Sequence, residues 1–141
     1  MSRLIRFVKR YPLSLLCVAA IWYLCLLFNA PRTRLNDVPL IDKWVHVAMY
    51  LGTCSLIWFE YLRAHRRPQW RRLLTWAVVA PAAMSGLIEW LQANATATRS
   101  GDWADFAANC IGIVLAALLG RYVLPRVAGR RGFFTSTESR P

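Results

Sequence analysis

The sequence predicts an all-α integral membrane protein, a four-transmembrane-helix bundle with both termini in the cytoplasm. Its 141 residues are 57% hydrophobic although they include 18 Lys and Arg, so the apolar residues must be concentrated in blocks. Four such blocks are close to the roughly 17 to 25 residues with which a helix crosses a bilayer. In lipid, a helix pairs its backbone amides within one segment. The predicted spans are Pro12 to Phe28, Trp44 to Phe59, Leu73 to Leu91 and Phe106 to Leu124.

The positions of the basic residues predict the orientation of these spans. The net charge is +11, and 14 of the 18 Lys and Arg lie in the N-terminal segment, the second loop and the C-terminal end. Because cytoplasmic loops carry the excess of Lys and Arg, both termini are predicted to be cytoplasmic, in a multi-pass protein of the cell inner (cytoplasmic) membrane. The charges form no stripe along a fold, which argues against nucleic acid and makes the lipid bilayer the expected partner.

The spans divide the chain into a basic cytoplasmic N-terminus (1–11), a membrane domain (12–124) and a basic cytoplasmic tail (125–141) expected to be disordered. The first span follows a basic start, as in a signal peptide, but Asn29-Ala30-Pro31 lacks a small-x-small cleavage pattern. It is therefore expected to remain as an anchor. The four cysteines form no C-x-x-C pair and have no His at metal spacing, so neither a disulfide nor a metal is predicted, and no cofactor is expected.

The second and third spans each have a polar face at the end predicted to lie outside. Asp42 and His46 are four residues apart and share a helix face, with Lys43 beside them. Ser85, Glu89 and Gln92 follow one another at spacings of four and three, so they too share a face. Pro81 lies within the third span, where the loss of an amide donor predicts a kink.

The fourth span begins with a third polar group. Asp102, Asp105, Asn109 and Gly112 are separated by three, four and three residues, which places them on one stripe of a helix that Asp102 could cap. Gly112, Ala116 and Gly120 repeat every four residues, a pattern typical of close helix packing. Since the stripe faces inward, Asp105 and Asn109 are predicted to point into the bundle, toward Glu89 and His46.

These polar residues carry a resemblance to a known family. The motifs are Asp42-Lys43-x-x-His46-x-x-x-Tyr50, Glu89-x-x-Gln92 and Arg99-x-x-Asp102-x-x-Asp105-x-x-x-Asn109-x-x-Gly112. In this order they resemble a VanZ-like family membrane protein over about residues 38–120. The family takes its name from a component associated with resistance to teicoplanin. The resemblance therefore implies a cell-envelope protein linked to glycopeptide antibiotic resistance, and it implies no defined biochemical activity.

Three classes of function are open for this cluster. A binding or accessory protein would use Lys43 and Arg99 to meet the anionic part of a lipid-linked or peptidyl ligand of the envelope, although both could equally anchor at the headgroups. The candidate binding residues are Asp42, Lys43, His46, Glu89, Gln92, Arg99, Asp102, Asp105 and Asn109.

A membrane enzyme would use Glu89, Asp105 or His46 as general acid or base, or would hold a metal with them. The sequence has no H-E-x-x-H and no phosphate-binding loop to support that class. A small transporter, assembled as a homo-oligomer, would require an ionisable group near the membrane midplane, and the central thirds of the spans have none. Hydrogen bonding between helices could also account for Glu89, Gln92, Asn109 and His46 without any ligand.

Overall fold

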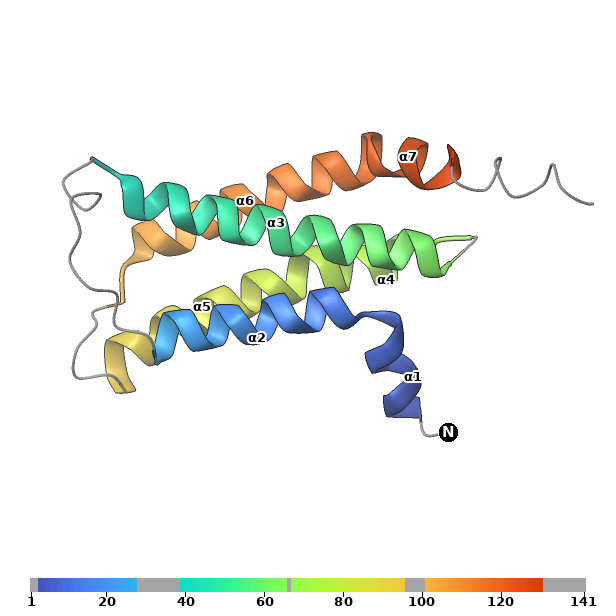
Figure 1. Ribbon diagram of the computed structural model, residues 1–141. Coiled ribbons are helices and arrows are strands. Elements are labelled where there is room, and N and C mark those ends of the chain that lie inside the picture. Colours follow the sequence, from blue (N-terminus) through green and yellow to red (C-terminus); the bar gives the residue numbers. More distant parts are fainter. Residues whose placement is uncertain (1–2, 28–38, 66, 96–100, 131–141) are drawn as a thin grey trace, which may run out of the picture.

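The computed structural model describes residues 3–27, 39–65, 67–95 and 101–130, and these residues form helices joined by short connections, with no strand among them (Figure 1). The elements are α1 (Arg3–Arg10), α2 (Pro12–Leu26), α3 (Ile41–Ala64), α4 (Trp70–Leu74), the π-helical turn η2 (Thr75–Val79), α5 (Ala80–Ala95), α6 (Trp103–Tyr122) and α7 (Leu124–Arg130).

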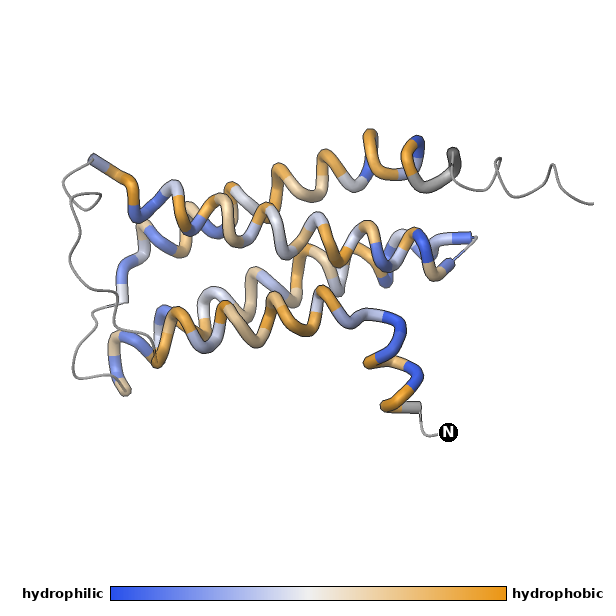
Figure 2. The backbone as a smooth tube through the Cα atoms, in the orientation of Figure 1, coloured by the Kyte–Doolittle hydropathy of each residue, from blue (hydrophilic) through white to orange (hydrophobic). Residues whose placement is uncertain are grey.

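The long helices lie side by side as a bundle. Helix α3 packs most extensively against α6, while α5 contacts both α6 and α2. Helix α1, the connection between α3 and α4, and α7 lie at one end, here called the basic end (Figure 1). The first turns of α3 and α6 and the last turns of α5 lie at the opposite end, here called the polar end (Figure 1). Hydrophobic residues predominate between the two ends (Figure 2).

Two of the described helices are long and apolar enough to cross a membrane. One is the continuous helix Trp70–Ala95, formed by α4, η2 and α5, and the other is α6, Trp103–Tyr122. Helix α2 is apolar but shorter, and α3 has 24 residues with charged residues near both ends. Length and composition therefore support two spans, fewer than the four that the sequence predicts.

The third predicted span contains a π-helical turn shortly before Pro81. Proline lacks the amide donor, and its ring conflicts with the carbonyl four residues earlier, that of Ala77. The π-helical turn η2 lies over Thr75–Val79, directly before α5. A π turn accommodates one additional residue in the helix, so the helix continues through this region from Trp70 to Ala95.

Both ends of the described chain are helical. Within residues 1–11, Arg3–Arg10 form helix α1, which turns away from α2 (Figure 1). Residues 125–130 were predicted to be disordered, but they belong to α7, which packs against α3. Residues 131–141 lie outside the described part of the chain.

The small residues of α6 lie where α6 meets α3. A Cβ atom added at Gly112 would lie 2.5 Å from the carbonyl oxygen of Val47, and one at Gly120 would overlap the indole of Trp58. Ala116 is fully buried between them. This close backbone approach aligns the first turns of α3 and α6 at the polar end, where their polar side chains meet.

Candidate functional site

Lys43, in the first turn of α3, joins α3 to the start of α6. Its Nζ atom donates to Asp102 Oδ2 at 2.6 Å and to Asp105 Oδ1, and it lies 3.4 Å from Asp42 Oδ2. Asp102 also caps α6, because its Oδ1 accepts a hydrogen bond from the amide of Ala104 at 2.8 Å. The hydrogen bond from Lys43, together with that from Ala104, lowers the pKa of the Asp102 carboxyl. The charge of Lys43 is thus already balanced within the protein.

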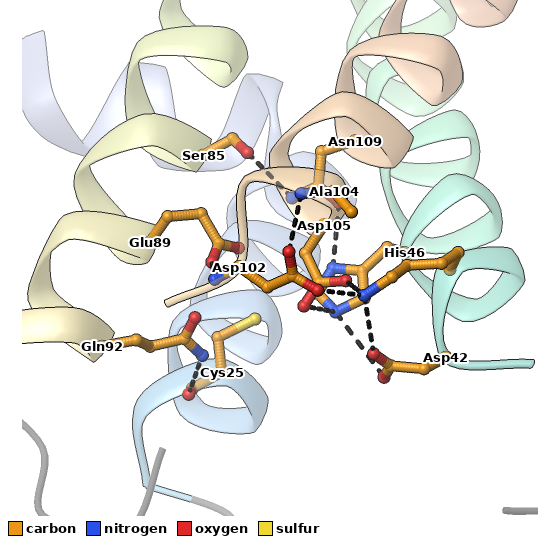
Figure 3. Close-up of polar contacts among 11 residues, drawn as sticks. Cys25, Asp42, His46, Ser85, Glu89, Gln92, Asp102, Ala104, Asp105 and Asn109 are labelled. Carbon is orange, nitrogen blue, oxygen red and sulfur yellow. Dashed lines mark hydrogen bonds and ion pairs between the residues drawn. The ribbon is translucent and has the colours of Figure 1, made fainter. Parts of the chain in front are cut away.

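His46 belongs to a buried chain of hydrogen bonds that links three helices. Its Nδ1 lies 3.0 Å from Asn109 Oδ1 on α6, and Asn109 Nδ2 donates to Ser85 Oγ on α5 at 2.8 Å (Figure 3). All three side chains are buried. Since the amide oxygen only accepts, Nδ1 of His46 must carry the proton in this arrangement.

The other ring nitrogen of His46 faces two carboxylates. Nε2 lies 3.7 Å from Asp105 Oδ2 and 3.9 Å from Asp42 Oδ1. One ligand-type atom from each of the three residues lies within 4.8 Å of the other two. Nε2 and the two carboxylate oxygens therefore converge on one point, as the ligands of a cation do.

Glu89, on α5, is the most buried carboxylate of the polar end, with 3% of its surface exposed. Its Oε2 atom accepts a hydrogen bond from the backbone amide of Asp102 at 3.0 Å (Figure 3). Its Oε1 atom is buried and has no hydrogen-bond partner among the described residues. A buried acceptor of this kind is costly unless it is protonated or meets another polar group.

Gly101 makes the contact between Glu89 and α6 geometrically feasible, and the sequence reasoning assigned it no role. A Cβ atom at this position would overlap the carbonyl oxygen of Glu89 and lie 3.0 Å from the Cβ of Ala93. Only glycine lets the chain pass this close to α5 just before α6 begins. In the sequence, this close approach is indicated only by a glycine directly before the capping residue Asp102.

Two predicted binding residues lie apart from this network or outside the described chain. Gln92 Nε2 donates to the carbonyl oxygen of Cys25 at 2.7 Å, so it joins α5 to α2 (Figure 3). Arg99 falls outside the described residues. The structure therefore brings together Asp42, Lys43, His46, Glu89, Asp102, Asp105 and Asn109, and it adds Ser85.

Glu60 is a buried carboxylate at the basic end that the sequence reasoning did not single out. Its two oxygens accept from the amides of Leu13 at 3.2 Å and Ser14 at 3.1 Å and from the Ser14 hydroxyl at 2.6 Å. It therefore satisfies the first turn of α2, whose own N-cap residue, Tyr11, makes no side-chain cap. The available signal was an acidic residue at the end of a span, next to an arginine-rich loop.

No family model matches this chain, and neither a curated protein nor a solved structure matches it. The resemblance to the VanZ-like family consequently rests on the motifs of the sequence alone.

Proposed function

We propose that this chain is a VanZ-like protein of the cytoplasmic membrane whose polar end faces outward and binds a ligand of the cell envelope. In this proposal α2, α3, the helix from Trp70 to Ala95 and α6 all span the bilayer, and both termini are cytoplasmic. The side-by-side packing of these helices and the gathering of the basic segments at one end support it (Figure 1).

The charges of the polar end indicate the chemistry of the ligand. The described cluster has four carboxylates, on Asp42, Glu89, Asp102 and Asp105, and one lysine, which is held by aspartates. An anionic headgroup would meet excess negative charge here, whereas an amino group would find acceptors. Of the two ligand classes that the sequence leaves open, we therefore favour a peptidyl ligand that presents an amine, bound by an accessory protein and not altered by it.

The Oε1 atom of Glu89, which has no hydrogen-bond partner among the described residues, carries this proposal. A network that only held helices together would be expected to pair both oxygens of its most buried carboxylate, because an unpaired buried acceptor costs about 1–3 kcal/mol. The ammonium group of a bound ligand would donate to this atom and would reduce the excess negative charge of the cluster.

The test is mass spectrometry of the species that co-purify with the protein from its native membranes. The wild type is compared with the double variant Glu89→Gln, Asp105→Asn, which keeps the shape of both side chains but removes two charges. Arg67→Gln, Arg71→Gln, which removes two exposed charges at the basic end, is the control. An amine-bearing peptidyl species enriched with the wild type and the control, but absent from the double variant, is the expected result. Identical bound species in all three samples would refute the proposal.

The resemblance implies a link between the family and teicoplanin resistance, which can be measured separately for this chain. Cells that express the wild type should be less susceptible to teicoplanin than cells that express the double variant at equal membrane levels. Equal susceptibility would remove resistance from the proposal without affecting ligand binding.

The orientation has its own test. In a cysteine-free background, Asn94→Cys at the polar end should react with a membrane-impermeant thiol reagent added to intact cells. Arg67→Cys at the basic end should react only after the cells are opened. The opposite pattern would invert the topology.

A second function, metal-assisted catalysis, is favoured by one observation, the convergence of Asp42, His46 and Asp105. Imidazole and carboxylate are common ligands of divalent transition metals. In an enzyme of this kind, Glu89 would be the acid or base beside the metal. The three residues fit such an ion only if Lys43 releases Asp42 and Asp105, which it now contacts.

Thermal unfolding with added Mn²⁺ or Zn²⁺ tests the metal directly. A metal that binds the folded state at 100 times its dissociation constant stabilises it by about 2.7 kcal/mol. The wild type should then gain stability, while Asp42→Asn, an exposed position, should not. No gain in the wild type would exclude this second function.

A further inference from the structure

The basic end contains a cavity that neither the polar cluster nor the proposed function uses. It has a volume of about 1260 Å³ and lies among α2, α3 and the helix formed by η2 and α5. Leu15 and Val18 of α2, Ile57 of α3 and Met84 of α5 form part of its apolar wall. The volume exceeds the roughly 300–1,000 Å³ of a pocket for a drug-sized molecule. The cavity can thus take a long apolar chain.

Basic side chains from three helices line the same cavity where it opens at the basic end, here called its mouth. They are Arg6, Lys9 and Arg10 of α1, Arg63 of α3 and Arg72 of α4. None of the five forms an ion pair with a carboxylate among the described residues. An anion placed at this mouth would therefore compete with no acidic side chain for them.

The one buried carboxylate nearby, that of Glu60, offsets no more than one of these five charges. Both of its oxygens are engaged by Leu13 and Ser14 in the first turn of α2. Ser14 lines the cavity, and Glu60 does not. The mouth thus keeps an excess of positive charge.

Helix α1 positions three of the basic residues at the mouth. It is amphipathic, with Leu4, Ile5, Phe7 and Val8 exposed beside its basic residues. A basic helix of this kind lies in the plane of the membrane interface, with its apolar side chains in the acyl boundary. That depth is also the depth of phospholipid phosphate groups.

We propose that this cavity binds one anionic phospholipid from the leaflet at the basic end. Its phosphate lies among the arginines of α1, α3 and α4, which suit phosphate because of their multiple donors. One acyl chain enters the cavity along α2 and α3. The site requires the chain to span a membrane, but it is independent of any ligand at the polar end.

The experiment is native mass spectrometry of the full-length protein in detergent, titrated with phosphatidylglycerol or with phosphatidylcholine of the same acyl chains. We expect one phosphatidylglycerol to bind at concentrations at which phosphatidylcholine does not. Inorganic phosphate should not displace it, because it lacks the acyl chain. Equal binding of the two lipids would overturn the proposal.

Two variants from the same loop region separate a site from general charge attraction. Arg63→Gln, Arg72→Gln removes two charges at the mouth, whereas Arg67→Gln, Arg71→Gln removes two exposed charges that do not line the cavity. Removing one basic side chain at a membrane surface weakens binding about fivefold, so the first pair should weaken phosphatidylglycerol binding about 25-fold. The second pair should change the affinity for phosphatidylglycerol by less than about threefold. Equal weakening by both pairs would mean that no discrete site exists.

A second pair of variants tests the acyl chain without changing any charge. Val18→Trp places a ring in the cavity, and Leu16→Trp places the same ring on the exposed face of α2. Only Val18→Trp should abolish the single bound phosphatidylglycerol. Full binding by both variants, with thermal unfolding unchanged, would show that the lipid does not enter the cavity.

Discussion

Replacing Gly112 with alanine should force α3 and α6 apart. The added Cβ atom would lie 2.5 Å from the carbonyl oxygen of Val47, 3.0 Å from the amide nitrogen of Leu51 and 3.1 Å from the Cβ of Tyr50. Two of these atoms belong to the backbone of α3, and a helix backbone cannot yield at one atom alone. The two helices must therefore separate along the contact that aligns the polar end.

The magnitude follows from two opposing effects. Overpacking of this kind costs about 1–3 kcal/mol. Alanine within a helix has a more favourable helix propensity than glycine, by about 1 kcal/mol. Gly112→Ala should therefore destabilise the protein by up to about 2 kcal/mol. Gly52 of α3 is the matched control, since an added Cβ would have nothing within 4 Å. Gly52→Ala keeps the gain in helix propensity, so the two variants should differ by about 1–3 kcal/mol.

The assay is thermal unfolding of both variants in the same detergent, followed by circular dichroism. A lower melting temperature for Gly112→Ala than for the wild type, and an equal or higher one for Gly52→Ala, is the expected result. If the two variants melt together, then the backbones of α3 and α6 are not in close contact, and the proposed geometry of the polar end is wrong.

Two further predictions concern the carboxylates. Glu60→Ala leaves two amides and the Ser14 hydroxyl without their buried acceptor, so it should destabilise the protein by about 3 kcal/mol. Ser14→Ala should then destabilise the Glu60→Ala variant less than it destabilises the wild type. Additive losses of stability in this double-mutant cycle would contradict the coupling. The hydrogen bond from Lys43 holds the pKa of Asp102 below its ordinary value of 3.8. The Asp102 carboxylate therefore stabilises the folded protein fully above pH 3.8, and this stabilisation is lost as the pH falls through the lower pKa of the folded state. The melting-temperature advantage of the wild type over Asp102→Asn should accordingly be constant near neutral pH and shrink in acid, and an advantage that persists through the acid titration would count against this ion pair.

The sequence was most informative where helical periodicity alone decides the outcome. Spacings of three and four residues place Ser85 and Glu89 on one face of α5, and the same rule places Asp105 and Asn109 on one face of α6. All four point into the same network because α3, α5 and α6 pack with those faces inward. The predicted cap at Asp102 likewise depends on local geometry, and the structure places it there.

The residue spacing within one helix does not predict the partners of each side chain, because the partners depend on how far the helices are shifted along one another. Lys43 could have faced a ligand, but α6 begins at the level where its aspartates reach the ammonium group. Gln92 shares a face with Glu89, yet it lies far enough along α5 to contact α2 instead. The kink at Pro81 stays a prediction, and the π turn just before it, within a continuous helix, was not predicted.

The contact between Glu60 and α2 sets an order for biogenesis. Glu60 follows Ser14 by 46 residues, so the first turn of α2 is synthesised well before the side chain that completes it. Until α3 has been translated and has packed, two amides in the first turn of α2 lack this acceptor. If α2 and α3 both span the bilayer, as proposed above, then the two helices together, and not α2 alone, are the smallest unit in which the first turn of α2 has its acceptor.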